Sequence, residues 1–528
     1  MNAVLVALIL LPLLGAAATL VPGLFGADEQ AAGRRALRFG AVVTGLALAL
    51  SIALAAGFDR AHSARMQAVT DLPWIPAIGV RLHLGVDGIS LPLLLLTALL
   101  TFLCAVYSLR RLPEGPGTPS PRAYTGLLLL LETGMLGTFA VLDLILFFLA
   151  FEVVLLPMYF LIARWGQGTK AASAQASANR FILYTLLGSA IMLLGFLLLG
   201  LKSGTFDMTV LAHRHGAGLS HSTQVLVVLA VGLGLAVKAP MWPFHSWLPD
   251  AHTAAPTTGS VLLAGVLLKM GTYGFVRVLL PDTPEGMTVF APYLAAFAVV
   301  GIIYGSLACL ALVRPGAKGD LKRLIAYSSV GHMGFVLLGI ATLTPTGVNG
   351  ALFANIAHGL VTGLLFFLVG AVKDRYGTAD LDTIAGATGR TGAALYGRAP
   401  RLGGLLAFAA VASLGLPGLA GFWGELLAMF GSFRPAAGLD RPAFLVFMAL
   451  AGLGTLLTAA YLLGVVRRVC MGDPRSPHLS TAPGIPDVQG YEFAAWTPLV
   501  ALTVLAGFWP AVLLGLSNPA VTALFGGS

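Results

Sequence analysis

The chain has 528 residues, of which 57% are hydrophobic and only 10% are charged, and its mean hydropathy is +0.89. Soluble globular domains carry about 25% charged residues, so this composition excludes an ordinary soluble enzyme. The net charge of +9 lies in short loops between apolar runs rather than along one face, which argues against a nucleic-acid partner. Basic loops of this kind set the orientation of membrane proteins.

Apolar runs of about twenty residues, the length that crosses the hydrocarbon core of a bilayer, recur along the whole chain. We therefore expect an all-α integral membrane protein with about fourteen transmembrane helices. The expected spans are 3–24, 36–57, 88–110, 124–142, 144–163, 178–201, 223–248, 257–280, 289–313, 322–343, 348–372, 402–433, 443–468 and 494–516. Lys and Arg concentrate in alternate loops, which predicts that both termini lie on the outer side of the membrane.

Motifs for cofactors are missing from the sequence. The cysteines Cys104, Cys309 and Cys470 lie in or beside apolar runs, and no CxxC or Cys/His spacing suits an iron–sulfur cluster or zinc. Neither a GxxxxGK[ST] loop nor a strand-associated GxGxxG is present. We expect no redox centre, nucleotide or metal in this chain, so energy for any transport comes from partners or an ion gradient.

Two of the expected spans are interrupted. Span 7 carries Pro240 and Pro243 in its middle, and span 12 carries Pro417 between glycines. The two lie five spans apart, and a matched pair of broken helices is typical of inverted repeats with a transport site at the breaks. The alternative is two ordinary proline kinks. The predicted units are an N-terminal part (1–123), a first five-helix repeat (124–281), a second repeat (289–470) and a C-terminal span (494–516).

Six titratable residues fall at similar depth on six different spans. A charge at mid-membrane costs roughly 2.5–3.5 kcal/mol on insertion scales, so such residues are usually functional. Together they predict a polar axis through the bundle, along which protons are exchanged. The alternatives are structural roles: an ion pair between Glu152 and Lys238, and histidines held in the core by hydrogen bonds. The six residues are Glu152, Lys238, Lys269, His332, His358 and Glu425.

Further candidates lie near this axis. Glu132 is another buried acid, about one helical turn from the centre of span 4. His245, Asp250 and His252 lie at the end of span 7, where they form either a mouth for protons or helix caps.

Several segments around these residues resemble one known family. LAVKAPMWPFHSWLPDAH, APTTGSVLLAGVLLKMGTYGFVR, GDLKRLIAYSSVGHMGF and GFWGELL, in this order, resemble the proton-translocating antiporter-like subunits of respiratory complex I. FEVVLLPMYFLIARWG, the AHGL segment around His358 and LTAAYLLGVVRR point more narrowly to the subunit M group, which includes mitochondrial chain 4. The resemblance implies fourteen spans, inverted repeats and broken spans 7 and 12.

The resemblance also implies roles for individual residues. Glu152 and Lys238 match a modulating pair, and Lys269 matches a central connecting lysine. The remaining matches are two relay histidines, a terminal acid and a second, less critical acid, at His332, His358, Glu425 and Glu132. One departure is Phe151, which stands where many relatives have tryptophan.

The resemblance finally implies partners and location. We expect other membrane-arm subunits of complex I, including homologous antiporter-like subunits, with NADH, flavin, iron–sulfur clusters and quinone in partner subunits. The location expected is the bacterial cell membrane. The hypothesis is proton pumping coupled to quinone reduction. Alternatives are a subunit of a multisubunit sodium/proton antiporter or membrane-bound hydrogenase, or a scaffold whose polar axis is inert.

Overall fold

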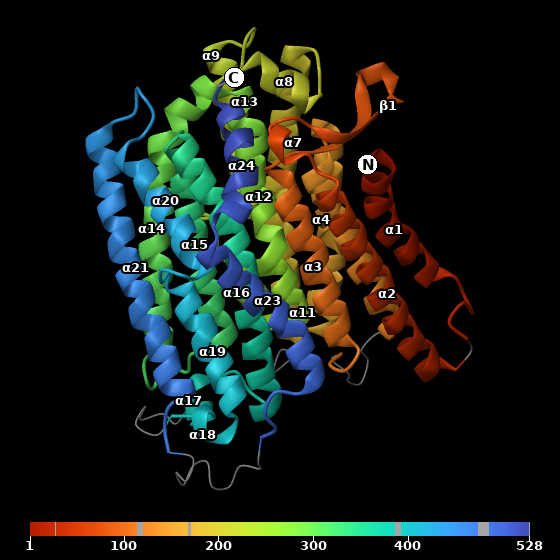
Figure 1. Ribbon diagram of the computed structural model, residues 1–528, viewed down its shortest axis with the longest axis vertical. Coiled ribbons are helices and arrows are strands. Elements are labelled where there is room, and N and C mark those ends of the chain that lie inside the picture. The colour runs from red at the N-terminus through yellow and green to blue at the C-terminus, as the bar shows by residue number, and fades with distance from the viewer. Residues whose placement is uncertain (27, 113–119, 167–170, 386–391, 474–484, 527–528) are drawn as a thin grey trace.

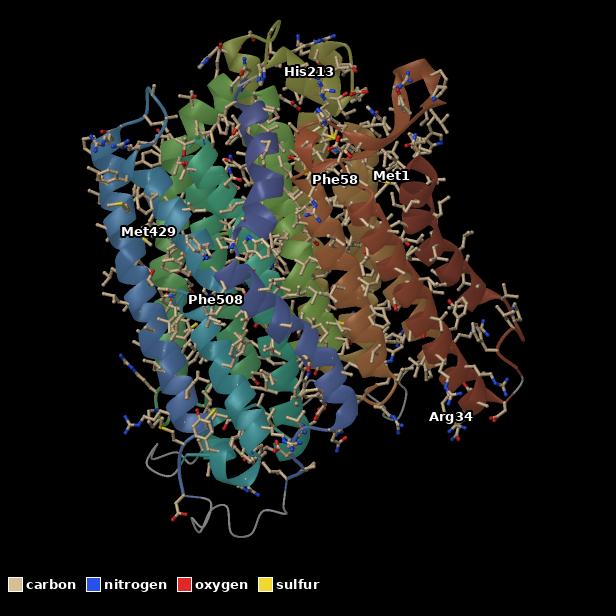
Figure 2. The ribbon with its side chains drawn as sticks, viewed as in Figure 1. Met1, Arg34, Phe58, His213, Met429 and Phe508 are labelled. Atoms are coloured by element: carbon tan, nitrogen blue, oxygen red, sulfur yellow. The ribbon has the colours of Figure 1, made fainter. Side chains whose placement is uncertain are left out.

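The computed structural model describes residues 1–26, 28–112, 120–166, 171–385, 392–473 and 485–526. Within these ranges thirteen helices are long and apolar enough to cross a membrane. The remaining expected span, number 12, consists of two shorter apolar helices. Both chain ends lie at the same end of the bundle, as an even number of crossings requires (Figure 1). Arg34 lies at the opposite end from Met1 and His213 (Figure 2).

The N-terminal part contains three membrane helices and one hairpin that the all-helical prediction missed. The helices are α1 (Asn2–Leu20), α2 (Glu29–Ala56) and α3 (Ser90–Ser108). Between α2 and α3, strands β1 (Gln67–Ile75) and β2 (Val80–Val86) pair antiparallel. Gly79 has φ +71 at the turn, a conformation that glycine adopts without steric penalty. Short 3-10 turns flank the strands at Arg60–His62 and Pro76–Ile78.

Spans 4 to 8 follow and include several broken helices. Their elements are α4 (Pro121–Ala140), α5 (Leu144–Val153), α6 (Leu155–Trp165), α7 (Ala171–Ser203), α8 (Met208–Arg214), α9 (His221–Lys238) and α10 (Trp247–Ala254). Span 8 is continuous but irregular: α11 (Thr257–Leu262), α12 (Leu268–Gly274) and α13 (Leu280–Asp282) are joined by π-helical turns at Leu263–Leu267 and Phe275–Leu279.

Spans 9 to 14 complete the bundle. Their elements are α14 (Pro284–Val313), α15 (Leu321–Ala341), α16 (Pro345–Tyr376), α17 (Leu381–Ala385), α18 (Leu395–Arg398), α19 (Pro400–Ser413), α20 (Ala420–Phe433), α21 (Arg441–Val469), α23 (Gly490–Phe508) and α24 (Ala511–Leu524). The prediction of one continuous last span over 494–516 is wrong, because the helix breaks at Trp509 and Pro510. Proline has no N–H for the helical ladder and instead starts the next helix, α24.

The interruptions of spans 7 and 12 lie where the prolines predicted them. Lys238 is the last residue of α9, and eight residues separate it from α10. The α19–α20 break includes Gly415 and Gly418, both with positive φ. At the first break the Trp247 indole donates to the Val237 carbonyl at 3.1 Å, which supplies a partner for a buried acceptor.

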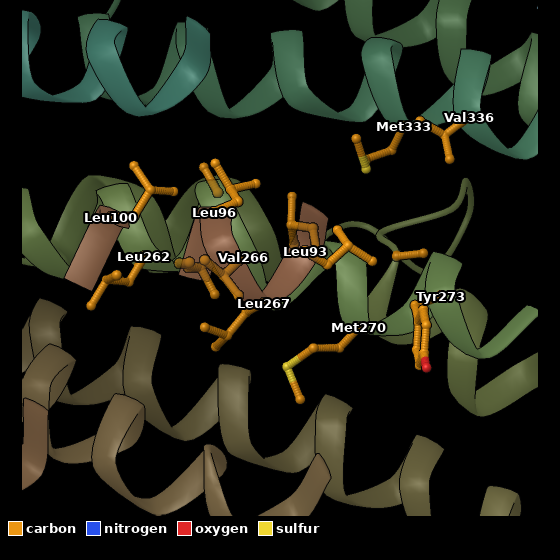
Figure 3. Close-up of a cluster of buried hydrophobic side chains, with 14 of the residues drawn as sticks. Leu93, Leu96, Leu100, Leu262, Val266, Leu267, Met270, Tyr273, Met333 and Val336 are labelled. Atoms are coloured by element: carbon orange, nitrogen blue, oxygen red, sulfur yellow. The ribbon is translucent and has the colours of Figure 1, made fainter. Parts of the chain in front are cut away.

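The centre of the bundle is formed by span 8 and α16, whose most apolar windows are 100% and 94% buried. Leu93, Leu96 and Leu100 of α3 lie along span 8 in a buried apolar cluster (Figure 3). Span 8 and α16 approach closely through glycines: a Cβ at Gly359 would lie 2.9 Å from the Gly265 carbonyl oxygen. This approach places polar groups of the two helices within hydrogen-bond distance.

Candidate functional site: a buried polar row

The centre of the row is a direct contact between Lys269 and His358. Lys269 is 0% exposed, and its Nζ lies 2.6 Å from Nδ1 of His358. The same ammonium group donates to the carbonyl of Ala264, inside the first π-helical turn. A π turn shifts the helical hydrogen-bond pattern by one residue, and such turns are frequent at functional sites. The irregular helix therefore provides part of the lysine's hydrogen bonding.

His332 connects the histidines to Glu425. Its Nδ1 lies 3.1 Å from the Glu425 carboxylate, and its Nε2 lies 3.0 Å from the Ser413 hydroxyl. The rings of His332 and His358 are 5.7 Å apart between centroids. Both histidines line a small cavity together with Ser413 and Glu425. The cavity offers about 20 Å³ to the centre of a water-sized sphere, which is sufficient for one water molecule.

Lys238 and Glu152 lie apart from this connected group. The Nζ of Lys238 is buried without a hydrogen-bond partner and lies 4.6 Å from the centre of the Phe151 ring. The two side chains form no ion pair within 4.0 Å. Oε1 of Glu152 is also buried without a partner, and Ser189 is the polar neighbour of this carboxylate. An aromatic face thus contacts the lysine, while the neighbouring carboxylate remains within its electrostatic range.

Irregular backbone lies beside three of the candidate site residues. Glu152 lies next to the α5–α6 break, and Lys238 ends α9. Lys269 lies between two π-helical turns. Pro157 explains the first break, since it cannot donate to the carbonyl four residues earlier, at Val153. Broken helices expose backbone carbonyls and can move as separate rigid pieces, which suits sites that bind and release a proton.

Glu132 on α4 is brought to the interior but not into the row. Its side chain is 0% exposed, and neither carboxylate oxygen has a hydrogen-bond partner. An ionised carboxylate in this position would be strongly disfavoured. Glu132 is therefore a buried acid that forms no hydrogen bond with the other predicted site residues.

Two further buried basic side chains lie in the bundle, at His252 and Lys322. His252 is 0% exposed, stacks on Phe366 with ring centroids 4.5 Å apart, and has no partner at either ring nitrogen. Lys322 is also 0% exposed, and its Nζ donates to the Ala255 carbonyl at 2.8 Å. From the sequence, His252 was predicted at a proton mouth or helix cap, and no role was predicted for Lys322. Asp320 caps the helix and shows that Lys322 lies inside it.

Asp250, also proposed for this mouth, lies in a more exposed cluster. It accepts from Arg180 at 2.6 Å and contacts Arg323 at 3.3 Å. Exposed pairs of this kind contribute at most about 1 kcal/mol to stability. His245 has an edge-to-face contact with Tyr304, with ring centroids 5.0 Å apart. The end of span 7 thus combines an exposed ionic cluster with the buried His252.

At the opposite end, an ionic pair joins the hairpin to α8. Nδ1 of His83 lies 2.8 Å from the carboxylate of Asp207. Burial opposes ionisation of Asp207, but the hydrogen bonds from His83 and Thr209 outweigh it and lower the pKa of Asp207 to about 2. Burial likewise disfavours the charged form of His83, but the Asp207 carboxylate outweighs this and raises the pKa of His83 above 6.5.

A second pair at this end is deeper. Arg277 of span 8 donates to Asp87 at 2.6 Å and to the Tyr273 hydroxyl at 3.1 Å. Both charged side chains are almost fully buried. Within the described parts of the chain, no cluster of three or more His, Cys, Asp or Glu side chains is arranged to hold a metal ion.

A bundle of membrane helices, two of them interrupted, around a buried Lys–His–His–Glu row has the architecture of an antiporter-like membrane subunit. The family described as NADH:quinone oxidoreductase/Mrp antiporter, TM, matches residues 141–453. Subunit M of NADH-quinone oxidoreductase from Rhodobacter capsulatus is 38% identical over 96% of this chain and 94% of its own. Its counterpart from Rickettsia prowazekii is 35% identical over 87% and 86%. The chain belongs to this family and is an antiporter-like membrane subunit of the complex I type.

Solved structures agree in fold. A chain of respiratory complex I from Thermus thermophilus with bound NADH superposes with a TM-score of 0.81 at 30% identity, over 98% of both chains. A chain of the Mrp complex from Dietzia superposes with a TM-score of 0.80 at 23% identity, over 99% and 97%. At that identity the Mrp likeness concerns the fold alone. The subunit M relatives therefore favour the complex I assignment over the antiporter alternative.

Proposed function

We propose that this chain moves protons across a bacterial cell membrane as part of NADH–quinone oxidoreductase. Other membrane-arm subunits lie beside it, and quinone is reduced in partner subunits. Two polar pairs, Lys269–His358 and His332–Glu425, whose histidine rings lie 5.7 Å apart between centroids, are the observation that carries the proposal. Their members exchange protons readily, because neutral imidazole accepts a proton at one nitrogen and releases another from the opposite nitrogen.

The hydrogen-bond pattern supports a direction for the first step. With Lys269 as the donor to Nδ1 of His358, the neutral ring carries its own proton on Nε2. That nitrogen is buried without a hydrogen-bond partner. Transfer from Lys269 to Nδ1 would create an imidazolium, which then releases the Nε2 proton. The small cavity beside both histidines has room for a bridging water to carry this proton to His332.

Glu425 is the proposed acceptor at the end of the row. It contacts Nδ1 of His332, while Ser413 holds the other nitrogen and so fixes the orientation of the ring. The Glu425 carboxylate stabilises His332 in its charged form, in which both ring nitrogens carry a proton. Once Glu425 is protonated, the attraction is lost and the histidine returns to its neutral state.

Lys238 and Glu152 form the proposed control element. No ion pair joins them here, and the Phe151 ring is 4.6 Å from the lysine. Because Glu152 and Lys238 both lie at helix breaks, small movements of α5 or α9 would bring the carboxylate closer or move it away. The electrostatic change would alter the proton affinity of Lys238. The energy for this movement would come from electron transfer to quinone in partner subunits.

The test is Glu425→Gln in the complete complex, in inverted membrane vesicles. The amide keeps the size of the side chain but cannot accept the proton. We expect assembled complex with NADH-driven quinone reduction and acidification of the vesicle lumen lowered together. Glu285→Gln is the matched control, since Glu285 forms an exposed pair with His221 at the surface. Wild-type acidification in the assembled Glu425→Gln complex would rule out this route and favour an inert scaffold.

The same vesicles separate the proton pump from a sodium/proton antiporter. A complex I subunit acidifies the lumen when NADH is supplied, without added sodium. Acidification that depends on an imposed sodium gradient and not on NADH would support the antiporter alternative.

A further inference from the structure

A large groove lies away from the polar row, at the end of the bundle where Arg34 lies (Figure 2). It has a volume of about 790 Å³ and is bounded by α1, α2 and α4. These helices lie side by side at the edge of the bundle (Figure 1). Only a third of the most apolar window of α1, and of that of α2, is buried within this chain, so both helices expose apolar side chains on its surface. The groove lies beside these exposed apolar faces.

The walls of the groove change character along its length. Leu13, Leu127 and Leu130 line its deeper part, and small residues such as Ala16 and Ala17 form the adjoining α1 wall. From Leu13 to Leu20 the groove follows α1 for about 10 Å, at 1.5 Å per residue. Small residues leave the space, while leucines keep it apolar. This part matches an acyl chain rather than a polar solute.

The shallow end of the groove is polar. Among the described residues, Ser120, Arg122 and Glu29 line it. Arg122 donates to the carbonyls of Thr19 and Leu20, which hold the guanidinium in place, and no carboxylate of the described residues pairs with it. No Lys or Arg lies within 4.0 Å of the Glu29 carboxylate among the described residues.

A second arginine adds positive charge beside the groove. Nη1 of Arg35 donates to the Phe25 carbonyl at 2.6 Å, next to Gly26, which lines the groove. Arg34 and Arg38 are exposed in the same N-terminal part of α2. Basic pockets between membrane helices at the interface recognise anionic lipid headgroups.

We propose that this groove binds an anionic phospholipid, with one acyl chain between α1 and α4 and its phosphate at Arg122 and Arg35. The lipid would join the N-terminal helix pair to the rest of the bundle by filling the space between them. The site does not depend on the proposed proton route. The groove combines apolar walls for the acyl chain with a fixed arginine for the phosphate. Both the chain and the charge of the lipid are therefore recognised.

The test uses the complete complex in nanodiscs of phosphatidylcholine. Small amounts of phosphatidylglycerol or phosphatidylcholine, each with a photoreactive acyl chain, are added, and cross-linked peptides are mapped. We expect phosphatidylglycerol to label the α1 and α4 peptides about thirtyfold more than phosphatidylcholine does, because Arg122 and Arg35 each contribute about fivefold, or about 1 kcal/mol. Equal labelling by the two lipids would overturn headgroup recognition.

Three variants make the test specific. Arg122→Gln should lower the preference for phosphatidylglycerol over phosphatidylcholine by about fivefold. Arg164→Gln is the matched control, because Arg164 is exposed in the last turn of α6 and does not line the groove. Ala17→Phe fills the groove from an exposed position and should abolish labelling by both lipids, even if Arg122→Gln fails to assemble. Unchanged labelling in Ala17→Phe would overturn the proposal.

Two further measurements identify the occupant. Inorganic phosphate added at millimolar concentration should not compete with phosphatidylglycerol, because the acyl chain contributes to binding. Full competition would show a phosphate site and not a lipid site. A photoreactive amino acid at position 17 should cross-link to lipid; a cross-link to another subunit would show that protein covers this groove, against the proposal.

Discussion

Nζ of Lys269 lies 2.6 Å from Nδ1 of His358 while also contacting the carbonyl of Ala264. At this separation one nitrogen donates and the other accepts. The contact therefore favours a pair that shares one proton over a pair in which both groups are charged. Two cations so close in the low dielectric of a membrane protein would repel each other strongly. A proton that arrives on one group therefore favours departure of a proton from the other.

Replacement of the central lysine tests this coupling directly. In Lys269→Met, we expect quinone reduction coupled to lumen acidification to fall by about tenfold or more, as expected when a positioned proton carrier is lost. Lys202→Met is the control, because Lys202 is exposed at the end of α7. Both variants are assayed in vesicles that contain equal amounts of assembled complex. Equal activities would show that Lys269 is not on the proton route.

The glycine contact between span 8 and α16 predicts a steric effect on the same pair. A Cβ at Gly359 would lie 2.5 Å from the Leu96 side chain and 2.9 Å from the Gly265 carbonyl oxygen. In Gly359→Ala the helices must move apart, so His358 and Lys269 should separate and proton transfer should slow several-fold. The measurement is the ratio of protons moved to NADH oxidised, together with the rate.

Gly363→Ala is the matched control on the same helix. Its added Cβ would meet Leu100 at 3.4 Å, an ordinary van der Waals contact. We expect nearly wild-type rates for this variant. Similar losses in both variants would indicate a general effect of alanine on α16 rather than a change in the Lys269–His358 contact.

The tryptophan at the span 7 break should contribute to stability. In Trp247→Phe the Val237 carbonyl loses its indole donor, and an unsatisfied buried polar group costs about 1–3 kcal/mol. We expect a lower midpoint temperature for thermal unfolding of the purified complex. Trp496→Phe is the control, because its buried indole nitrogen makes no hydrogen bond. A larger loss in Trp496→Phe would show that ring volume, and not the hydrogen bond, decides stability here.

The His83–Asp207 pair predicts pH-dependent stability of the hairpin. His83 has a raised pKa, so its contribution is complete below pH 6.5 and is lost as the pH rises through its folded pKa. Asp207 has a lowered pKa of about 2, so its contribution is present above about pH 4 and is lost as the pH falls toward 2. The hairpin should be most stable between about pH 4 and 6.5.

Hydrogen exchange of hairpin peptides, corrected for intrinsic rates, measures this effect. Protection of β2 should decrease between pH 6 and pH 9 in the wild type. The decrease should be absent in His83→Gln, which has no titrating ring. A pH dependence that persists in His83→Gln would assign it to another group.

The sequence by itself determined the membrane class, the approximate spans and the family. Hydrophobic runs and prolines are local signals, so the breaks near Lys238 and Pro417 could be predicted. Apolar depth also identified Lys269, His332, His358 and Glu425, because a charged or polar residue is conspicuous in an apolar run. The hairpin of β1 and β2 was missed because it lies in a loop between strong helical signals.

Only the tertiary structure decided which of these residues meet. Lys269 and His358 are 89 positions apart, and His332 and Glu425 are 93 apart. The Lys269–His358 contact depends on the close approach of helices at Gly265 and Gly359, which no local pattern encodes. The fold also buries His252 and Lys322, which lie at or beyond the ends of the expected spans 223–248 and 322–343. Burial of a polar residue depends on the helices that pack around it, so its environment follows from the assembled bundle.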